Sequence, residues 1–194
     1  MDELLALMII ILWLLIPLFW IPVHLMTALF RRLGILTYLV VFTIWSPLAF
    51  LIYKNSFLFL GYVVTVPLII RIGGWILFIG GLLIHLWTLK LLGLAALVGL
   101  PEISQGQKGR FINTGAFSIV RHPTYLAHTM IFSGAFLVSG VIALGVLTII
   151  DLLVVLLLII PIEERELMNR FGDEYIEYKK RVPRFLPSNI MRIK

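Results

Sequence analysis

The sequence contains no cysteine, and this absence removes several kinds of chemistry at once. Disulfide bonds, thiolate nucleophiles and cysteine-ligated zinc are excluded, while the redox compartment stays undetermined. There is no HExxH pattern, and His122 and His128 are six positions apart, on different faces of a helix, so we expect no metal site. Catalytic groups must therefore come from histidine, acidic residues, arginine and tyrosine.

Charged residues are also scarce, at 13% of 194 residues, whereas soluble domains carry about 25%. Apolar residues make up 61%, and the mean hydropathy is +1.07. A backbone in lipid must satisfy its own hydrogen bonds, which favours helices over open sheets. We therefore expect an all-α integral membrane bundle that forms one domain over residues 1–194. Its N-terminal spans would cover 1–92 and its catalytic core 93–187.

Long uncharged runs predict about five transmembrane helices, since roughly 20 residues cross a bilayer. The first two runs cover residues 4–30 and 33–53, and the third covers about 67–92 after a short interfacial element. The first run contains two prolines, Pro17 and Pro22, so we expect a tilted or kinked helix there.

The last two spans are predicted from a run of 41 residues, 122–162, that contains one acid and neither lysine nor arginine. This run is too long for one span and suits two, with Ser139-Gly140 as the turn between them. A helical hairpin follows from this reading. The single acid, Asp151, should face the interior of the bundle or water, because a charge in lipid is costly.

Basic residues are divided unevenly between the two predicted membrane faces, 14 against 2. Under the positive-inside rule this division puts the N-terminus outside and the C-terminus in the cytoplasm. The net charge of +6 is then explained by topology and anionic lipid, and we expect no nucleic-acid partner. The cytoplasmic set comprises Arg31, Arg32, Lys90, Lys108, Arg110, Arg121 and eight residues from Arg165 onward, and the other face has Lys54 and Arg71.

Two polar clusters stand at the open ends of the hairpin, at 121–125 and 163–166. Pro123 suits the first position of a helix, with His122 as its N-cap. The helix start, with Arg121 and His122, should attract an anion. Because the two ends of a hairpin meet at one membrane face, we expect both clusters to form an active site. A plainer interpretation is that Arg121 is a topological anchor, that His122 is only a cap, and that the acidic residues merely end the span.

The segment before the hairpin, 93–120, is polar and rich in glycine. Its length of about 28 residues exceeds what a bundle loop requires, and long loops are usually functional or disordered. We favour a functional segment that covers the site. After the hairpin, residues 171–181 predict a short amphipathic helix that is stopped by Pro183.

Two sequence blocks resemble those of a known enzyme family. TGAFSIVRHPTYLAH (114–128) and EERELMNRFGDEYIEYKKRVPRFLP (163–187) are similar to the isoprenylcysteine carboxyl methyltransferase family, in a prokaryotic form, and to its phospholipid methyltransferase relatives. The resemblance implies a membrane enzyme that uses S-adenosylmethionine, releases S-adenosylhomocysteine, and has its pocket at the cytoplasmic face. It implies catalytic roles for Arg121, Glu163 and Glu164. It also implies cofactor contacts from Gly109, Arg110, Phe111, Ile112, Phe117, His122, Pro123, Thr124, Tyr125, Glu163 and Glu164.

One departure from this family concerns the methyl acceptor. The isoprenylcysteine enzymes have an arginine about four residues before the acidic pair, where this chain has Leu-Ile-Ile-Pro-Ile at 158–162. Arg121, Arg165 and Arg181 are the possible replacements. The resemblance favours O-methylation of the carboxylate of an isoprenylated cysteine or similar lipid-tailed acid.

The alternatives are a phospholipid or small-amine N-methyltransferase, an NADPH-dependent membrane reductase, and a transporter or structural bundle. For an enzyme of the family we expect a lipid-tailed substrate that enters from the bilayer, contacts with membrane lipids, and a monomer.

Overall fold

The computed structural model describes residues 2–104 and 111–187, and the regular elements in these ranges are all helices. One isolated antiparallel bridge joins Val63 to Val141. This confirms the all-α fold expected from the sequence. The elements are α1 (Asp2–Trp13), η1 (Ile16–Trp20), α2 (Ile21–Leu25), α3 (Thr27–Leu33), α4 (Leu36–Lys54), α5 (Ser56–Leu60), α6 (Leu68–Leu92), α7 (Leu94–Leu97), α8 (Leu100–Ile103), α9 (Ala116–Ile119), α10 (Pro123–Ser139), α11 (Ile142–Val154), η2 (Val155–Ile159), α12 (Ile160–Phe171) and α13 (Asp173–Arg181).

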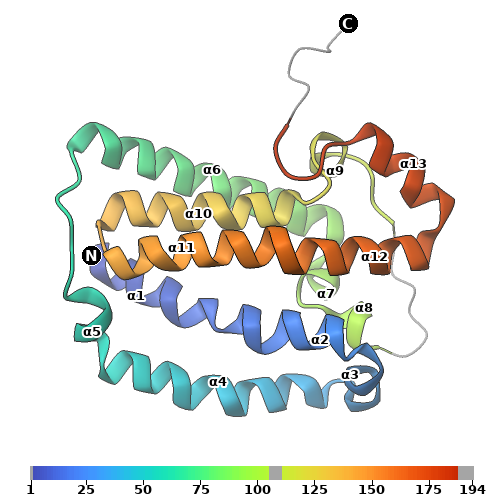
Figure 1. Ribbon diagram of the computed structural model, residues 1–194, viewed down its shortest axis with the longest axis horizontal. Helices are drawn as coiled ribbons and strands as arrows, with labels where there is room; N and C mark the ends of the chain where they lie inside the picture. Colours follow the sequence, from blue (N-terminus) through green and yellow to red (C-terminus); the bar gives the residue numbers. More distant parts are fainter. Residues whose placement is uncertain (1, 105–110, 188–194) are drawn as a thin grey trace, which may run out of the picture.

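Four long helical stretches are apolar and long enough to cross a membrane: Asp2–Leu25, Leu36–Lys54, Leu68–Leu92 and Ile142–Phe171. Helix α10, at 17 residues, lies at the short end of the spanning range and packs against α6, α11 and α1. Figure 1 shows these helices side by side, with α9 and α13 gathered at one end of the bundle. The bundle therefore has a long apolar body and a polar cap at one end.

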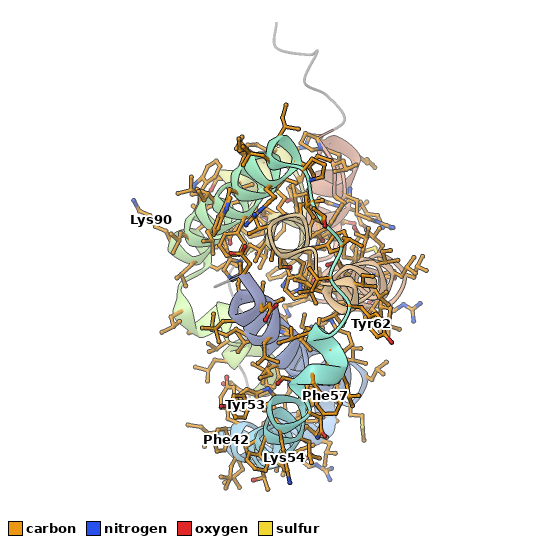
Figure 2. The ribbon with its side chains drawn as sticks, turned by 90° about the vertical axis from the view of Figure 1, so that its left-hand side faces the viewer. Phe42, Tyr53, Lys54, Phe57, Tyr62 and Lys90 are labelled. Carbon is orange, nitrogen blue, oxygen red and sulfur yellow. The ribbon has the colours of Figure 1, made fainter. Side chains whose placement is uncertain are left out.

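Large apolar side chains cover the outside of the bundle. Figure 2 shows Phe42, Tyr53 and Phe57 pointing away from the helices, and they are 59%, 62% and 67% exposed. Such a surface is unfavourable in water and suits contact with lipid. It agrees with the membrane protein expected from the composition.

Helices α6 and α10 approach closely because glycines line their contact. A Cβ atom at Gly134 of α10 would lie 2.5 Å from the Phe78 backbone nitrogen of α6. A Cβ atom at Gly81 of α6 would lie 2.7 Å from the Ala127 carbonyl oxygen of α10. Small residues allow backbones to pack this tightly in membranes. The contact fixes the register of α10, and with it the position of the polar cluster at its start.

The predicted hairpin is present. Helix α10 ends at Ser139, and Gly140 adopts a left-handed conformation, φ 70°, with its N–H donating to the Phe136 carbonyl at 2.7 Å. A left-handed residue after a helix favours glycine, which has no Cβ to clash. Helix α11 begins two residues later and returns along α10.

Pro161 does not interrupt the helix near the end of the last span. The helix continues from Ile142 to Phe171. A π-helical turn, η2, precedes the proline, and the Ile160 N–H donates to the Val155 carbonyl five residues back. Proline has no N–H to donate, and a wider turn accommodates that loss without ending the helix. Glu163 and Glu164 therefore lie within a helix rather than at its end.

The remaining boundaries follow the expectations closely. Helix α6 starts after Pro67 and ends at Gly93, and α13 follows Gly172, which has φ 58°. In the N-terminal run, Pro17 lies in the π-helical element η1 and Pro22 at the start of α2, which ends at Leu25.

Candidate active site

The two polar clusters of the hairpin meet in the structure. Arg121 donates from Nη2 and Nε to Oε1 of Glu164, at 2.6 and 3.0 Å. His122, which is the N-cap of α10, makes no side-chain capping bond. Its ring nitrogens lie instead 3.4 Å from Glu164 Oε1 and 3.7 Å from Glu163 Oε2. The predicted juxtaposition of the hairpin ends is confirmed.

Glu164 is the centre of a buried ionic network. Its side chain is 3% exposed, and Lys179 and Arg184 approach its second oxygen at 3.1 and 3.3 Å. A buried carboxylate is stable only when cations and hydrogen bonds compensate for lost hydration. The network therefore joins the start of α10 to α12 and to the C-terminal segment.

Arg121 also contacts backbone atoms of the C-terminal segment. Its Nη1 donates to the carbonyls of Lys179 and Val182 at 3.0 and 2.6 Å, and its own N–H donates to the Pro183 carbonyl at 2.8 Å. The side chain is 7% exposed. These contacts place Arg121 in a positioning role, because its nitrogens are occupied by protein partners.

A cavity of about 320 Å³ lies beside this network. Of the residues predicted from the sequence, eight line it: Phe111, Ile112, Phe117, Arg121, His122, Thr124, Tyr125 and Glu163. Pro123 and Glu164 are buried next to these and are not part of the lining. Gly109 and Arg110 lie outside the described residues. The cavity is also lined by Ile16, Trp20, His24, His85, Leu92, His128, Val155, Ile159, Leu167, Arg170, Phe171 and Tyr178.

Aromatic rings form one wall of the cavity. The Phe111 ring centroid lies 5.2 Å from that of Phe171 and 5.3 Å from that of Tyr178. The Tyr178 hydroxyl donates to the Phe117 carbonyl at 2.6 Å. Burial raises the pKa of Tyr178 and of the neighbouring Tyr175 above the ordinary tyrosine value, so both stay neutral. This wall offers apolar ring faces and edges, against which a planar heterocycle can pack.

Glu163 contributes an unused acceptor to the cavity. Its Oε2 atom is buried and makes no hydrogen bond to any residue that the structure describes. The His122 ring at 3.7 Å is too distant for a hydrogen bond. Buried carboxylate oxygens normally have donors, so this atom suits a ligand that supplies N–H or O–H groups.

Several lining residues were not identified from the sequence. Arg170 pairs with Glu166 one turn earlier and lies over the Phe171 ring, 5.9 Å from its centroid. Glu166 also lies 2.9 Å from Nδ1 of His24, from α2. The spacing of 163, 167 and 170 along one helix face could have indicated Arg170, whereas the approach of His24 depends on tertiary packing.

Arg165 and Arg181, proposed from the sequence as acceptor-binding arginines, are exposed and do not line the cavity. Within the described ranges, no group of three or more His, Asp or Glu side chains could hold a metal ion.

A family model covers the part of the chain that contains the hairpin. The family model for Phospholipid methyltransferase matches residues 69–174, which include α6, both hairpin helices and α12. The chain belongs to the phospholipid methyltransferase family. The matched region and the four apolar helices together describe a membrane protein of this family.

One named relative is a methyltransferase. Methanethiol S-methyltransferase 1 of Bradyrhizobium diazoefficiens is 29% identical over 154 residues, which is 78% of this chain and 51% of the relative. The chain therefore spans about half the length of the relative that it matches. No solved structure matches this chain.

Proposed function

We propose that this chain transfers a methyl group from S-adenosylmethionine, which it binds in the cavity between α10, α12 and α13, and that it releases S-adenosylhomocysteine. The observation that carries this proposal is the buried Oε2 of Glu163, which accepts no hydrogen bond from any described residue and lies beside His122 at the start of α10. An amino acid ammonium or a ribose hydroxyl would supply the donor that this oxygen lacks. The donor set of the cavity therefore fits the cofactor.

Each part of the cofactor has a matching surface. The start of α10, with the positive end of its helix dipole and His122, suits the methionine carboxylate. The rings of Phe111, Phe117 and Tyr178 suit the adenine. Gly109 and Arg110 remain predicted contacts.

In this proposal the protein positions the two reactants and excludes water from them. S-adenosylmethionine supplies a methyl group on a sulfonium, which is reactive without activation by the protein. Holding two reactants in line can supply about 7–11 kcal/mol of the barrier. Arg121 and Glu164 serve this purpose indirectly, because they fix the start of α10 against α12.

For the acceptor, a lipid-tailed carboxylate such as that of an isoprenylated cysteine is the candidate that the sequence resemblance supports. Arg170 lines the cavity and could hold such a carboxylate, in place of the arginine that the chain lacks at 158–162. A carboxylate of pKa about 3.5 is already ionised at neutral pH and needs no base.

An acceptor that must lose a proton, a thiol or an amine, is the second candidate. The observation that favours it is the pairing of His128, which lines the cavity, with the buried Asp151. The named relative is a methanethiol S-methyltransferase, which acts on a thiol.

We place the polar cap, and hence the cavity, at the cytoplasmic face, with the N-terminus outside. The 14-to-2 division of basic residues supports this orientation. A lipid tail would then enter from the bilayer between helices.

The test of the cofactor is calorimetric binding of S-adenosylhomocysteine to the detergent-purified protein. We expect binding by the wild type and at least a tenfold loss in Glu163→Gln, which keeps the shape of the side chain. Glu177→Gln, at an exposed site on α13, is the matched control and should bind as the wild type does. Absence of binding by a folded wild type would contradict the proposal.

A further inference from the structure

His128 lies deeper in the cavity than the residues that match the cofactor. It stands one turn beyond Thr124 on the same face of α10, about 6 Å further along the helix axis. Both residues line the cavity, together with His85 from α6 and Ile16 and Trp20 from the N-terminal helices. A group bound beside His128 would therefore meet the cofactor from the interior of the bundle.

An acid lies directly behind His128. Nε2 of the His128 ring is 3.2 Å from Oδ2 of Asp151, which comes from α11 across the hairpin. The Asp151 side chain is 1% exposed, and its other oxygen accepts a hydrogen bond from the Trp13 indole N–H at 2.9 Å. The carboxylate is thus held in place by α1 while it faces the ring. A carboxylate so placed stabilises the imidazolium that forms when the ring accepts a proton.

A purely structural explanation does not account for this pair. Ionisable residues are costly inside a membrane bundle and usually mark functional sites. A structural pair would be expected to share an aligned hydrogen bond, yet neither His128 Nε2 nor Asp151 Oδ2 makes one with any residue in the described ranges. The His128 side chain also keeps 22% of its surface exposed, and this residue lines the cavity. The pair is therefore held together by charge, with Asp151 buried and the His128 ring bordering the cavity.

We propose that the His128–Asp151 pair removes a proton from the methyl acceptor, and that the acceptor is therefore a thiol or an amine with an apolar tail rather than a carboxylate. This inference rests on the proposed function and specifies its substrate class. A carboxylate acceptor is already ionised, so it would have no proton for the pair to remove. The apolar lining from Ile16, Trp20, Val155 and Ile159 suits a hydrocarbon tail.

When the acceptor is a thiol, its S–H proton passes to the His128 ring, and the acceptor sulfur forms a new bond to the methyl carbon. The bond from that carbon to the sulfonium breaks, and its electron pair stays on the departing sulfur. The products are a methyl thioether, S-adenosylhomocysteine and a proton, which then leaves the ring for solvent. For an amine, the nitrogen takes the place of the sulfur.

The experiment measures methyl transfer by the full-length protein in detergent to 1-decanethiol, decylamine and N-acetyl-S-farnesylcysteine. We expect turnover of the thiol or the amine. His128→Gln and Asp151→Asn should lower kcat for that acceptor about 100-fold or more while S-adenosylhomocysteine affinity stays unchanged. Thr129→Val is the matched control, since Thr129 is the next residue of α10 and does not line the cavity.

A second readout separates proton transfer from packing. The rate of His128→Gln with the thiol should recover as the pH rises toward the thiol's own pKa, because a thiolate needs no base. Asp151→Asn keeps the shape of the side chain, so its loss of kcat cannot be attributed to a cavity.

Three results would overturn the inference. These are turnover of the farnesylated acid alone, thiol or amine turnover that His128→Gln leaves intact, or a His128→Gln defect that pH does not relieve. Each of them leaves cofactor binding, and so the proposed function, standing. Failure of a folded wild type to bind S-adenosylhomocysteine would remove both.

Discussion

Arg121 and Glu164 stand 43 positions apart in the sequence and share two hydrogen bonds, from Nε and Nη2 to the same carboxylate oxygen, with both side chains less than 10% exposed. The pair joins the start of α10 to α12. Such a pair is costly to break, because removal of one partner leaves the other charged and buried.

Glu164→Gln is therefore expected to destabilise the protein by about 3–5 kcal/mol, since Arg121 and Lys179 would lose a common anion. Unfolding by SDS, followed by circular dichroism, measures the change. Glu177→Gln breaks the exposed pair with Lys180 and should leave the unfolding midpoint unchanged. Equal midpoints for Glu164→Gln and wild type would show that the network does not stabilise the fold.

Gly134→Ala should destabilise the bundle by about 1–3 kcal/mol, because its Cβ would lie 2.5 Å from the Phe78 backbone nitrogen and would force α6 and α10 apart. Gly73→Ala is the matched control on α6, since a Cβ there meets nothing within 4 Å. This control should be neutral or more stable, because alanine favours a helix. The comparison of SDS unfolding free energies checks both, and a neutral Gly134→Ala would contradict the close packing.

Alkaline pH should destabilise the cap through Tyr178. Burial raises the folded-state pKa of Tyr178 above the unfolded value of about 10, so the folded protein binds the proton more tightly. This contribution is complete below pH 10 and is lost as the pH rises toward the folded-state pKa. Tyr178→Phe should reduce the slope of unfolding free energy above pH 10 by about 1.4 kcal/mol per pH unit. Tyr62→Phe, at a site that is 76% exposed, should not change the slope.

The membrane orientation can be measured directly because the chain has no cysteine. Single substitutions Lys54→Cys and Glu177→Cys stand at opposite ends of the bundle. In intact cells, a membrane-impermeant maleimide should label the cysteine at 54 and should reach the one at 177 only after lysis. The reverse pattern would place the site outside.

The sequence predicted the elements of this fold better than the contacts between them. Pro123 and Gly140 act through local backbone preferences, so the start and end of α10 could be inferred from residue type alone. The meeting of 121–125 with 163–166 also followed, because a hairpin of two equal spans has only one place for its open ends.

Contacts that depend on helix rotation could not be predicted in this way. Asp151 was expected to face the interior, but its pairing with His128 and Trp13 requires the rotation of three helices. The rotation of α10 is set by its glycine contact with α6. The π-helical turn before Pro161 shifts the phase of the residues that follow it, which include Glu163 and Glu164. Neither is visible as a periodic pattern.

The backbone contacts of Arg121 also have a consequence for biosynthesis. Glu164, Lys179 and Val182 follow Arg121 by 43, 58 and 61 positions, so all of them leave the ribosome after α10 has been made. Until they arrive, the start of α10 carries a cation with none of these partners. The candidate site is thus completed only when residues 179–184 fold back against the start of α10, so its assembly is a late step in the folding of the chain.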